Sequence, residues 1–219
     1  MRRTLYKYFS EQKHAEEFLD GQMLFRSLAY FRDYEDAVRG DEYEGTSKFQ
    51  PDGGLLVHNR TQRTTFTLPM AFESSVKAHE IFVYCVSRSL SADIARAFNA
   101  VACVEITKIK TLCARIQAAL PSTASFKAQR VDYYPQTQGS NPRWALPDNI
   151  ATSKLDRWAS QDEYRFIFSL TDALGFEKVE LRLIDRKNRP APKPEDHILH
   201  VLTIGSLRDI SILHDFKTL

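Results

Sequence analysis

The chain has 219 residues and a formal net charge of +2, with 43% hydrophobic and 26% charged residues. These values predict one globular domain over residues 1–219, and so small a charge gives no general attraction to nucleic acid or anionic membranes. The three cysteines have no close C-x-x-C spacing, and no apolar run approaches the length of a membrane span. We therefore expect a cytoplasmic protein without membrane association, disulfide framework or zinc site.

The first third of the chain alternates between strand and helix. We expect a short strand at residues 5–9, then a helix at residues 11–20 that begins after Ser10 and ends at Gly21. A second extended segment is expected at residues 23–25. A short helix should follow around Tyr30, Phe31 and Tyr34, and the segment 46–59 has the turn residues of a loop, with a strand expected at its end.

The rest of the chain is predicted to be mostly strands. A strand is expected at residues 80–87, because residues 81–86 form a continuous apolar run typical of a central strand, with Ser87 at its exit. Helices are expected at 92–98 and 109–120, and the turn-rich segment 135–149 carries a Trp144 that is predicted to be exposed. The remaining expected strands lie at 55–58, 64–68, 101–106, 130–134, 164–170, 179–184, 198–204 and 210–213. This pattern predicts an α+β fold with helices mainly in the N-terminal half.

A glutamate lies at the start of the late predicted strand. Glu163 and Arg165 lead into an apolar run and follow Lys154 and Trp158. A carboxylate held on rigid backbone at such a position can stabilise positive charge that develops during a reaction. The more ordinary interpretation is that Glu163 and Arg165 form a solvated ion pair on an exposed face.

Several short motifs, taken in order, resemble a known family. They are the opening Leu5-Tyr6-Lys7-Tyr8-Phe9-Ser10, a helix that ends at Gly21, Phe25-Arg26-Ser27, Tyr84-Cys85-Val86-Ser87, and Lys154…Trp158…Glu163-Tyr164-Arg165. This order resembles a large uncharacterised bacterial family that includes phage abortive-infection proteins. The layout also resembles a compact mono-ADP-ribosyltransferase, which implies a split mixed or antiparallel sheet. Such a sheet carries a polar residue on its first strand, a hydroxyl on a central strand and a glutamate on a late strand.

The resemblance implies a toxin or defence enzyme that transfers ADP-ribose from NAD to a protein or nucleic acid acceptor. Glu163 would stabilise the oxocarbenium-like sugar that forms when the nicotinamide–ribose bond breaks. Gln161 lies two residues earlier and fits the Q-x-E arrangement of transferases that modify arginine. The hydroxyl of Ser87 could fix the ribose or the carboxamide.

The same resemblance assigns residues to NAD binding. Lys7 or Tyr6 would be the polar residue of the first strand, and Lys7 and Arg26 could offset the charge of the pyrophosphate. Ser27 follows Arg26 at the same strand end. Tyr30 or Tyr34 could stack on the nicotinamide ring.

Three other interpretations remain open. The acidic residues between Asp33 and Glu44, with Glu80 or Glu105, could bind a divalent metal for a nuclease, although a solvated helix and loop is the more ordinary outcome. The basic residues of the middle of the chain could bind nucleic acid. The chain could also be a non-catalytic antitoxin or immunity partner that binds through the aromatic residues near Tyr30. Cys85 is expected to be buried and unreactive.

Overall fold

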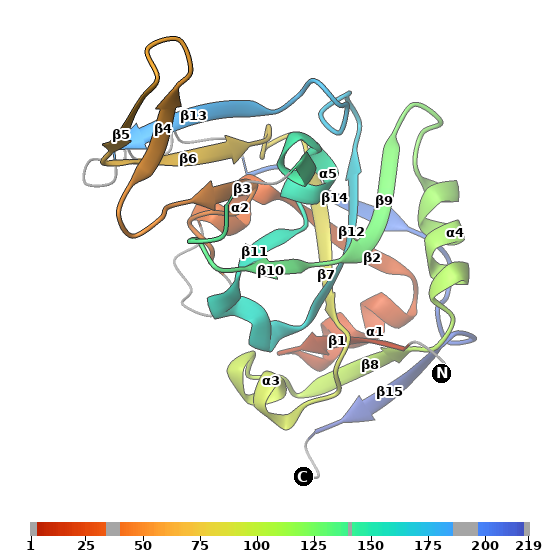
Figure 1. Cartoon of the computed structure of the whole chain (residues 1–219). Coiled ribbons are helices and arrows are strands. Elements are labelled where there is room, and N and C mark those ends of the chain that lie inside the picture. Colours follow the sequence, from red (N-terminus) through yellow and green to blue (C-terminus); the bar gives the residue numbers. More distant parts are fainter. Residues whose placement is uncertain (1–3, 34–39, 140–141, 186–196, 217–219) are drawn as a thin grey trace.

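The protein is an α+β structure, as expected. The computed structural model describes residues 4–33, 40–139, 142–185 and 197–216 (Figure 1). The strands are β1 (Leu5–Phe9), β2 (Gln22–Ser27), β3 (Thr46–Phe49), β4 (Leu55–Asn59), β5 (Thr64–Leu68), β6 (Met70–Ser75), β7 (Phe82–Ser87), β8 (Ala102–Ile106), β9 (Ser125–Arg130), β10 (Asp132–Tyr134), β11 (Ser153–Leu155), β12 (Glu163–Ser169), β13 (Glu180–Asp185), β14 (Leu199–Thr203) and β15 (Ser211–Asp215). The helices are α1 (Gln12–Leu19), α2 (Leu28–Asp33), α3 (Ala92–Ala97), α4 (Ile109–Ala119) and α5 (Pro147–Ile150), with 3₁₀ helices η1 (Pro142–Ala145) and η2 (Asp156–Gln161).

Eight strands form the main sheet. Six of them follow the order β14-β2-β7-β1-β8-β15, and β12 and β9 continue the sheet from the other edge of β7. Every pairing within this sheet is antiparallel. The central strand β7 is the apolar run that the sequence predicted, and it is enclosed on both sides by other strands (Figure 1).

The sheet divides along one edge of β7. On one side, β12 pairs with β7 over its whole length, from Glu163 opposite Ser87 to Phe168 opposite Phe82. On the other side, β1 reaches β7 only at Ser87, and β2 reaches it only at Phe82 and Val83. Among the described strands, residues 84–86 therefore have no register partner on this side. We call this gap between β1 and β2 the sheet fork.

Successive side chains along the paired strands point to opposite faces of the sheet, and each face packs against its own apolar core. Tyr84 and Phe166, which lie opposite each other, face the larger core, where α1 and α4 cover the sheet. Val83 and Ile167 face the other side and pack with Leu28 of α2. Glu163, Arg165 and Ile167 are spaced two residues apart along β12, and residues at that spacing point to the same face of a sheet. The side chains of Glu163 and Arg165 therefore lie on this second face.

Three smaller sheets extend from the main one. Strands β13, β6 and β3 form an antiparallel sheet, β4 and β5 form a hairpin, and β10 pairs with β11 in parallel (Figure 1). The expectation that Trp144 is exposed was wrong. Trp144 is buried against Tyr134, with ring centroids 5.3 Å apart, because the turn-rich segment folds over the parallel pair.

The loop predicted at residues 46–59 was wrong at its start. Strand β3 occupies Thr46–Phe49 and pairs with β6. The sequence pattern does not indicate β6 as a strand either. Ser47 and Lys48 in β3 and Glu73 in β6 are polar yet buried, so these strands lack the apolar pattern by which a strand is recognised. Strand β9 was missed for a similar reason, because its side chains are mixed in character and only half-buried.

The helices are not gathered in the N-terminal half. The longest, α4, spans Ile109–Ala119, and α5 and both 3₁₀ helices follow it in the chain. Helix α1 begins after Glu11 instead of Ser10, and Gly21 follows its end with a positive φ of 96°. None of the helices in the described residues is long and apolar enough to cross a membrane.

Candidate functional site

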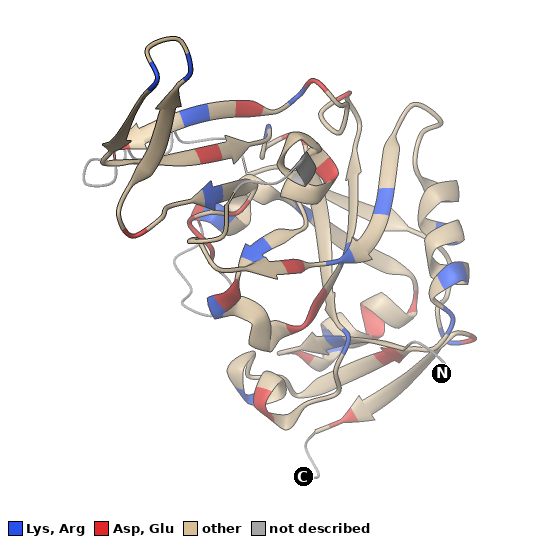
Figure 2. Ribbon diagram, in the orientation of Figure 1, with Lys and Arg blue, Asp and Glu red and all other residues tan. Residues whose placement is uncertain are grey.

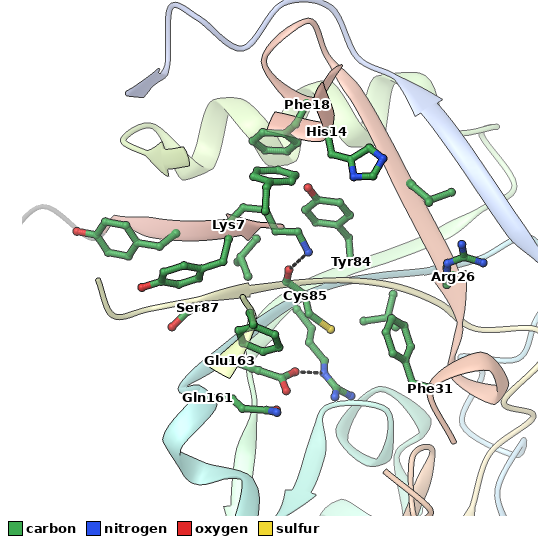
Figure 3. A pocket seen from close by; sticks show the side chains of 18 of the residues that line it. Lys7, His14, Phe18, Arg26, Phe31, Tyr84, Cys85, Ser87, Gln161 and Glu163 are labelled. Carbon is green, nitrogen blue, oxygen red and sulfur yellow. Dashed lines mark hydrogen bonds and ion pairs between the residues drawn. The ribbon is translucent and has the colours of Figure 1, made fainter. Parts of the chain in front are cut away.

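A cavity of about 460 Å³ opens at the sheet fork (Figure 3). Its wall includes side chains from β1, α1, β2, α2, β7, β11, η2, β12 and β14, together with Glu44 from the chain before β3. The size lies within the range of small-molecule and cofactor pockets. Of the residues predicted from the sequence, Tyr6, Lys7, Arg26, Tyr30, Ser87, Gln161 and Glu163 all line it.

Three of these residues form one row across the sheet. Ser87 at the end of β7 lies opposite Tyr6 of β1 on one side and opposite Glu163 of β12 on the other. The Ser87 hydroxyl accepts the backbone N–H of Ser89 at 3.1 Å, which leaves its own proton for donation to a ligand. Strand pairing therefore brings together a phenol, a hydroxyl and a carboxylate that lie far apart in the sequence.

Glu163 is a buried, doubly paired carboxylate. Its Oε1 accepts a hydrogen bond from Lys154 Nζ at 2.7 Å, and its Oε2 accepts one from Arg165 Nε at 2.8 Å. Burial alone would raise the pKa of Glu163, but the charges and hydrogen bonds of Arg165 and Lys154 outweigh it and hold the pKa far below its usual value. Glu163 is therefore ionised at neutral pH, and the expectation of a solvated Glu163–Arg165 pair was wrong.

Arg165 joins Glu163 to a second buried carboxylate, Glu44. The guanidinium donates to both Glu44 oxygens, from Nη1 at 2.5 Å and from Nη2 at 2.9 Å, and Nη1 also donates to the Ala151 carbonyl. Burial by itself would lower the pKa of Arg165, but Glu163 and Glu44 hold it well above its usual value. Lys154 lies 3.9 Å from Glu44. Glu44, Lys154, Glu163 and Arg165 thus form one ion-pair network, in which two negative formal charges balance two positive ones.

Gln161 is coupled to the same network. Its Oε1 accepts a hydrogen bond from Lys154 Nζ at 2.9 Å. Gln161 ends η2, and Asp162 then adopts a left-handed conformation with φ of 42°. Asp162 accepts hydrogen bonds from the side chains of Arg88 and Ser89, which fastens this turn to the end of β7 and fixes the entry into Glu163.

Lys7 reaches the cavity from the other face of the sheet. Its Nζ donates to the Cys85 carbonyl at 2.9 Å and lies 4.4 Å from the centre of the Tyr84 ring. The bond crosses the sheet fork, where β7 has no strand partner on that side among the described strands. In Figure 3, Lys7 lies on one side of β7, and Glu163 lies on the other.

Arg26 supplies a second cation at the wall. Its guanidinium lies 4.2 Å from the centre of the Tyr30 ring, and no acidic partner is found for it in the described ranges. Ser27 does not reach the cavity. It is buried, and its hydroxyl accepts the backbone N–H of Tyr30 at 3.4 Å near the start of α2. Tyr34 lies outside the described residues.

Sequence reasoning missed several residues of this wall. Glu44 and Lys154 complete the ion-pair network, and Tyr84, Phe31 and His14 line the cavity. In the sequence, Lys154 stands out only as part of a motif. Glu44 lies in a run of acidic residues, and no local signal distinguishes it from its acidic neighbours.

The thiol of Cys85 lies on the cavity wall as well. Burial, followed by the nearby charge of Glu163, raises its pKa to about 12, so it is protonated at neutral pH. Cys85 is therefore a poor nucleophile, as expected.

Two of the acidic residues considered for metal binding take part in ion pairs with arginine side chains. Asp41 and Glu44 are buried beside cations instead of solvated. In the part of the chain that the structure describes, no three His, Cys, Asp or Glu side chains lie close enough together to hold a metal ion. Glu35 and Asp36, which belong to the same acidic segment, lie outside the described residues.

The basic residues of the middle of the chain lie on several separate elements. Figure 2 shows blue segments spread over the β4–β5 hairpin, α4 and β9, with acidic segments between them. Several are paired: Arg96 contacts Asp93 at 2.7 Å, and Arg115 contacts Asp209 at 2.8 Å. This distribution does not resemble the continuous basic stripe of a nucleic-acid-binding protein.

Comparisons of this chain with protein-family models, with curated proteins and with solved structures found no match. Inference about its function therefore depends on the chemistry of the cavity at the sheet fork. The features that matter are the ionised Glu163 in its ion-pair network, the cations Lys7 and Arg26 outside that network, and the aromatic rings that these cations contact.

Proposed function

We propose that this protein is a mono-ADP-ribosyltransferase that cleaves NAD, its substrate, and transfers ADP-ribose to a protein or nucleic acid acceptor. The observation that carries the proposal is that ionised Glu163 shares one cavity with Ser87, Lys7 and Arg26. The sequence resemblance to compact transferases and to phage abortive-infection proteins agrees with this arrangement. On this proposal, the protein acts as a toxin or defence enzyme.

The chemistry requires a fixed negative charge beside a sugar. In the transfer, the bond between C1′ of the ribose and the nicotinamide nitrogen breaks, and nicotinamide leaves as a neutral molecule with the bonding electrons. The ribose becomes oxocarbenium-like, and a carboxylate beside it stabilises that charge. A nucleophilic atom of the acceptor then bonds to C1′ and releases its proton to solvent.

The ion-pair network suits Glu163 to this role. An ionised carboxylate can accept about four hydrogen bonds, and Lys154 and Arg165 use two of them, which leaves capacity for a ribose hydroxyl. Glu44 offsets the charge of Arg165, so the two cations do not cancel the field of Glu163. The carboxylate is thus both oriented and negative in its surroundings.

The rest of the wall fits a dinucleotide. Arg26 has no acidic partner among the described residues and can pair with a phosphate, which Arg binds in a bidentate manner. Lys7 adds a second positive charge on the other face of the fork. The half-buried rings of Tyr30 and Phe31 offer flat apolar surfaces against which a base can pack.

The test is release of nicotinamide and transfer of label from radioactive NAD, with whole-cell lysate as a source of acceptors. Wild-type protein should transfer label, and Glu163→Gln should lower the rate by roughly 100- to 1000-fold. Glu73→Gln is the matched control, because Glu73 is also a buried strand carboxylate but does not line the cavity. Equal NAD cleavage by wild type and a folded Glu163→Gln variant would refute the proposal.

A further inference from the structure

The burial of the acidic segment at residues 41–44 is unexpected, because this segment lies on a loop. It connects α2 to β3, yet Asp41 and Glu44 are almost completely buried. Burial of a carboxylate is costly unless cations and hydrogen bonds compensate for it. The partners of this segment therefore indicate why it is held inside the protein.

Glu44 holds the guanidinium that orients Glu163. Both Glu44 oxygens accept hydrogen bonds from Arg165, and the Ala151 carbonyl accepts a further one at 2.8 Å. These contacts fix the plane of the guanidinium, so that Nε is directed at Glu163 at 2.8 Å. The Glu44 carboxylate is itself part of the cavity wall.

The other residues of the segment contact the turn that leads into Glu163. Arg157 of η2 lies 3.7 Å from Asp41 and 3.4 Å from Glu42. Its guanidinium also lies 5.9 Å from the centre of the Tyr43 ring. Segment 41–44 thus contacts two parts of the protein next to Glu163. Glu44 contacts Arg165 on β12, and Asp41 and Glu42 contact Arg157 in η2.

We propose that Glu44 is a positioning residue for the transfer reaction, which acts on Glu163 through Arg165. The inference rests on the proposed function, because it concerns how Glu163 is presented to the ribose. Glu44 fixes the guanidinium and balances its charge. Without that balance, Lys154 and Arg165 would place an excess positive charge where the sugar becomes cationic in the transition state.

The first experiment compares kcat and KM for NAD in Glu44→Gln and in the control Glu73→Gln, at a temperature where both are folded. Glu44→Gln should lower kcat about 100-fold and change KM less than about threefold, since the lost effect is greatest in the transition state. Glu73→Gln should lose thermal stability but keep its kcat within about twofold. A Glu44→Gln variant with the kcat of the control would overturn the inference.

A second variant covers the case in which Glu44→Gln does not fold. Glu44→Asp keeps the charge but shortens the side chain, so the bidentate contact with Arg165 is displaced. We expect an intermediate fall in kcat, of roughly tenfold. Wild-type kcat in folded Glu44→Asp would likewise contradict a positioning role.

The third measurement does not depend on catalysis. Glu44→Gln leaves one excess positive charge in the ion-pair network and should lower the Tm by roughly 10 °C. Adding Lys154→Gln restores the balance, so the double variant should melt higher than the sum of the two single effects predicts. Additive effects would overturn the charge-balance argument. If wild-type protein does not cleave NAD, the proposed function fails, while this cycle still decides whether Glu44 and Lys154 are coupled.

Discussion

Glu163 is a carboxylate whose ionisation contributes to the stability of the fold. Burial opposes the charged form, but Arg165 and Lys154 outweigh it, and the pKa in the folded protein lies far below the ordinary value of 4.5. A carboxyl with a lowered pKa stabilises the folded state fully above its unfolded pKa, and this contribution is lost as the pH falls below about 4.5. The charged or titratable groups around it include Arg165 on β12, Lys154 on β11, Tyr133 on β10 and Cys85 on β7, and Glu44 pairs with the same two cations.

The prediction is a pH-dependent difference between wild type and Glu163→Gln. At pH 7 the variant should be less stable by about 3–5 kcal/mol, because two buried cations lose a partner. Between pH 4.5 and pH 3 the difference should shrink, since only wild type loses the contribution of the ionised carboxylate. Urea unfolding of both proteins at pH 7, 4.5 and 3 measures it. A difference that stays constant over this range would show that Glu163 is not held ionised by its neighbours.

The candidate site was accessible to sequence reasoning only where strand ends mark it. Glu163, Ser87 and Lys7 could be named because each lies on or at the end of a recognisable strand, and the antiparallel pairing then brings them to one cavity. Glu44 could not be named. Its role depends on a contact with Arg165, 121 residues away, and a carboxylate in an acidic turn gives no local sign of burial.

At the level of elements, Gly21 fixes how α1 joins β2. Its φ is 96°, and a Cβ added there would lie 2.1 Å from the carbonyl oxygen of Gly205. Helix α1 carries Phe18 and His14 to the cavity, so displacement of its C-terminal end also changes the wall. We expect Gly21→Ala to lower the free energy of unfolding by at least about 2 kcal/mol.

Chemical denaturation of Gly21→Ala measures this loss. Gly53→Ala is the control, because an added Cβ there would meet no atom within 4 Å. Its stability should change by less than about 0.5 kcal/mol. If both alanine variants were equally stable, the close approach of the Gly21 and Gly205 backbones would not constrain the end of α1.

The elements that could be predicted are those with a strong local pattern. β7 is apolar up to Ser87 and α4 repeats apolar residues at helical spacing, so both are predicted within two residues of their observed bounds. Strand β3 has the buried polar residues Ser47 and Lys48, and its strand character comes from pairing with β6. Such pairing is a long-range property, and tertiary contacts outweigh local propensity there.

For the whole molecule, the fold places the cavity where two groups of strands diverge from β7. If the proposed function holds, the protein should act on the cell that makes it. We expect induced expression of wild-type protein in a bacterial host to slow growth and to lower the NAD content of the cells. Glu163→Gln, produced at the same level, should permit growth, because the remaining rate is roughly 100- to 1000-fold lower.

The control in this experiment is again Glu73→Gln, whose substitution is buried but distant from the cavity wall, and it should still slow growth. Growth and NAD content are followed together, since a toxin that acts by binding would slow growth without consuming NAD. Equal growth arrest by wild type and Glu163→Gln, with NAD unchanged, would assign the effect to occlusion of a partner. That outcome would favour the non-catalytic interpretation, in which surface residues and not the ion-pair network carry the function.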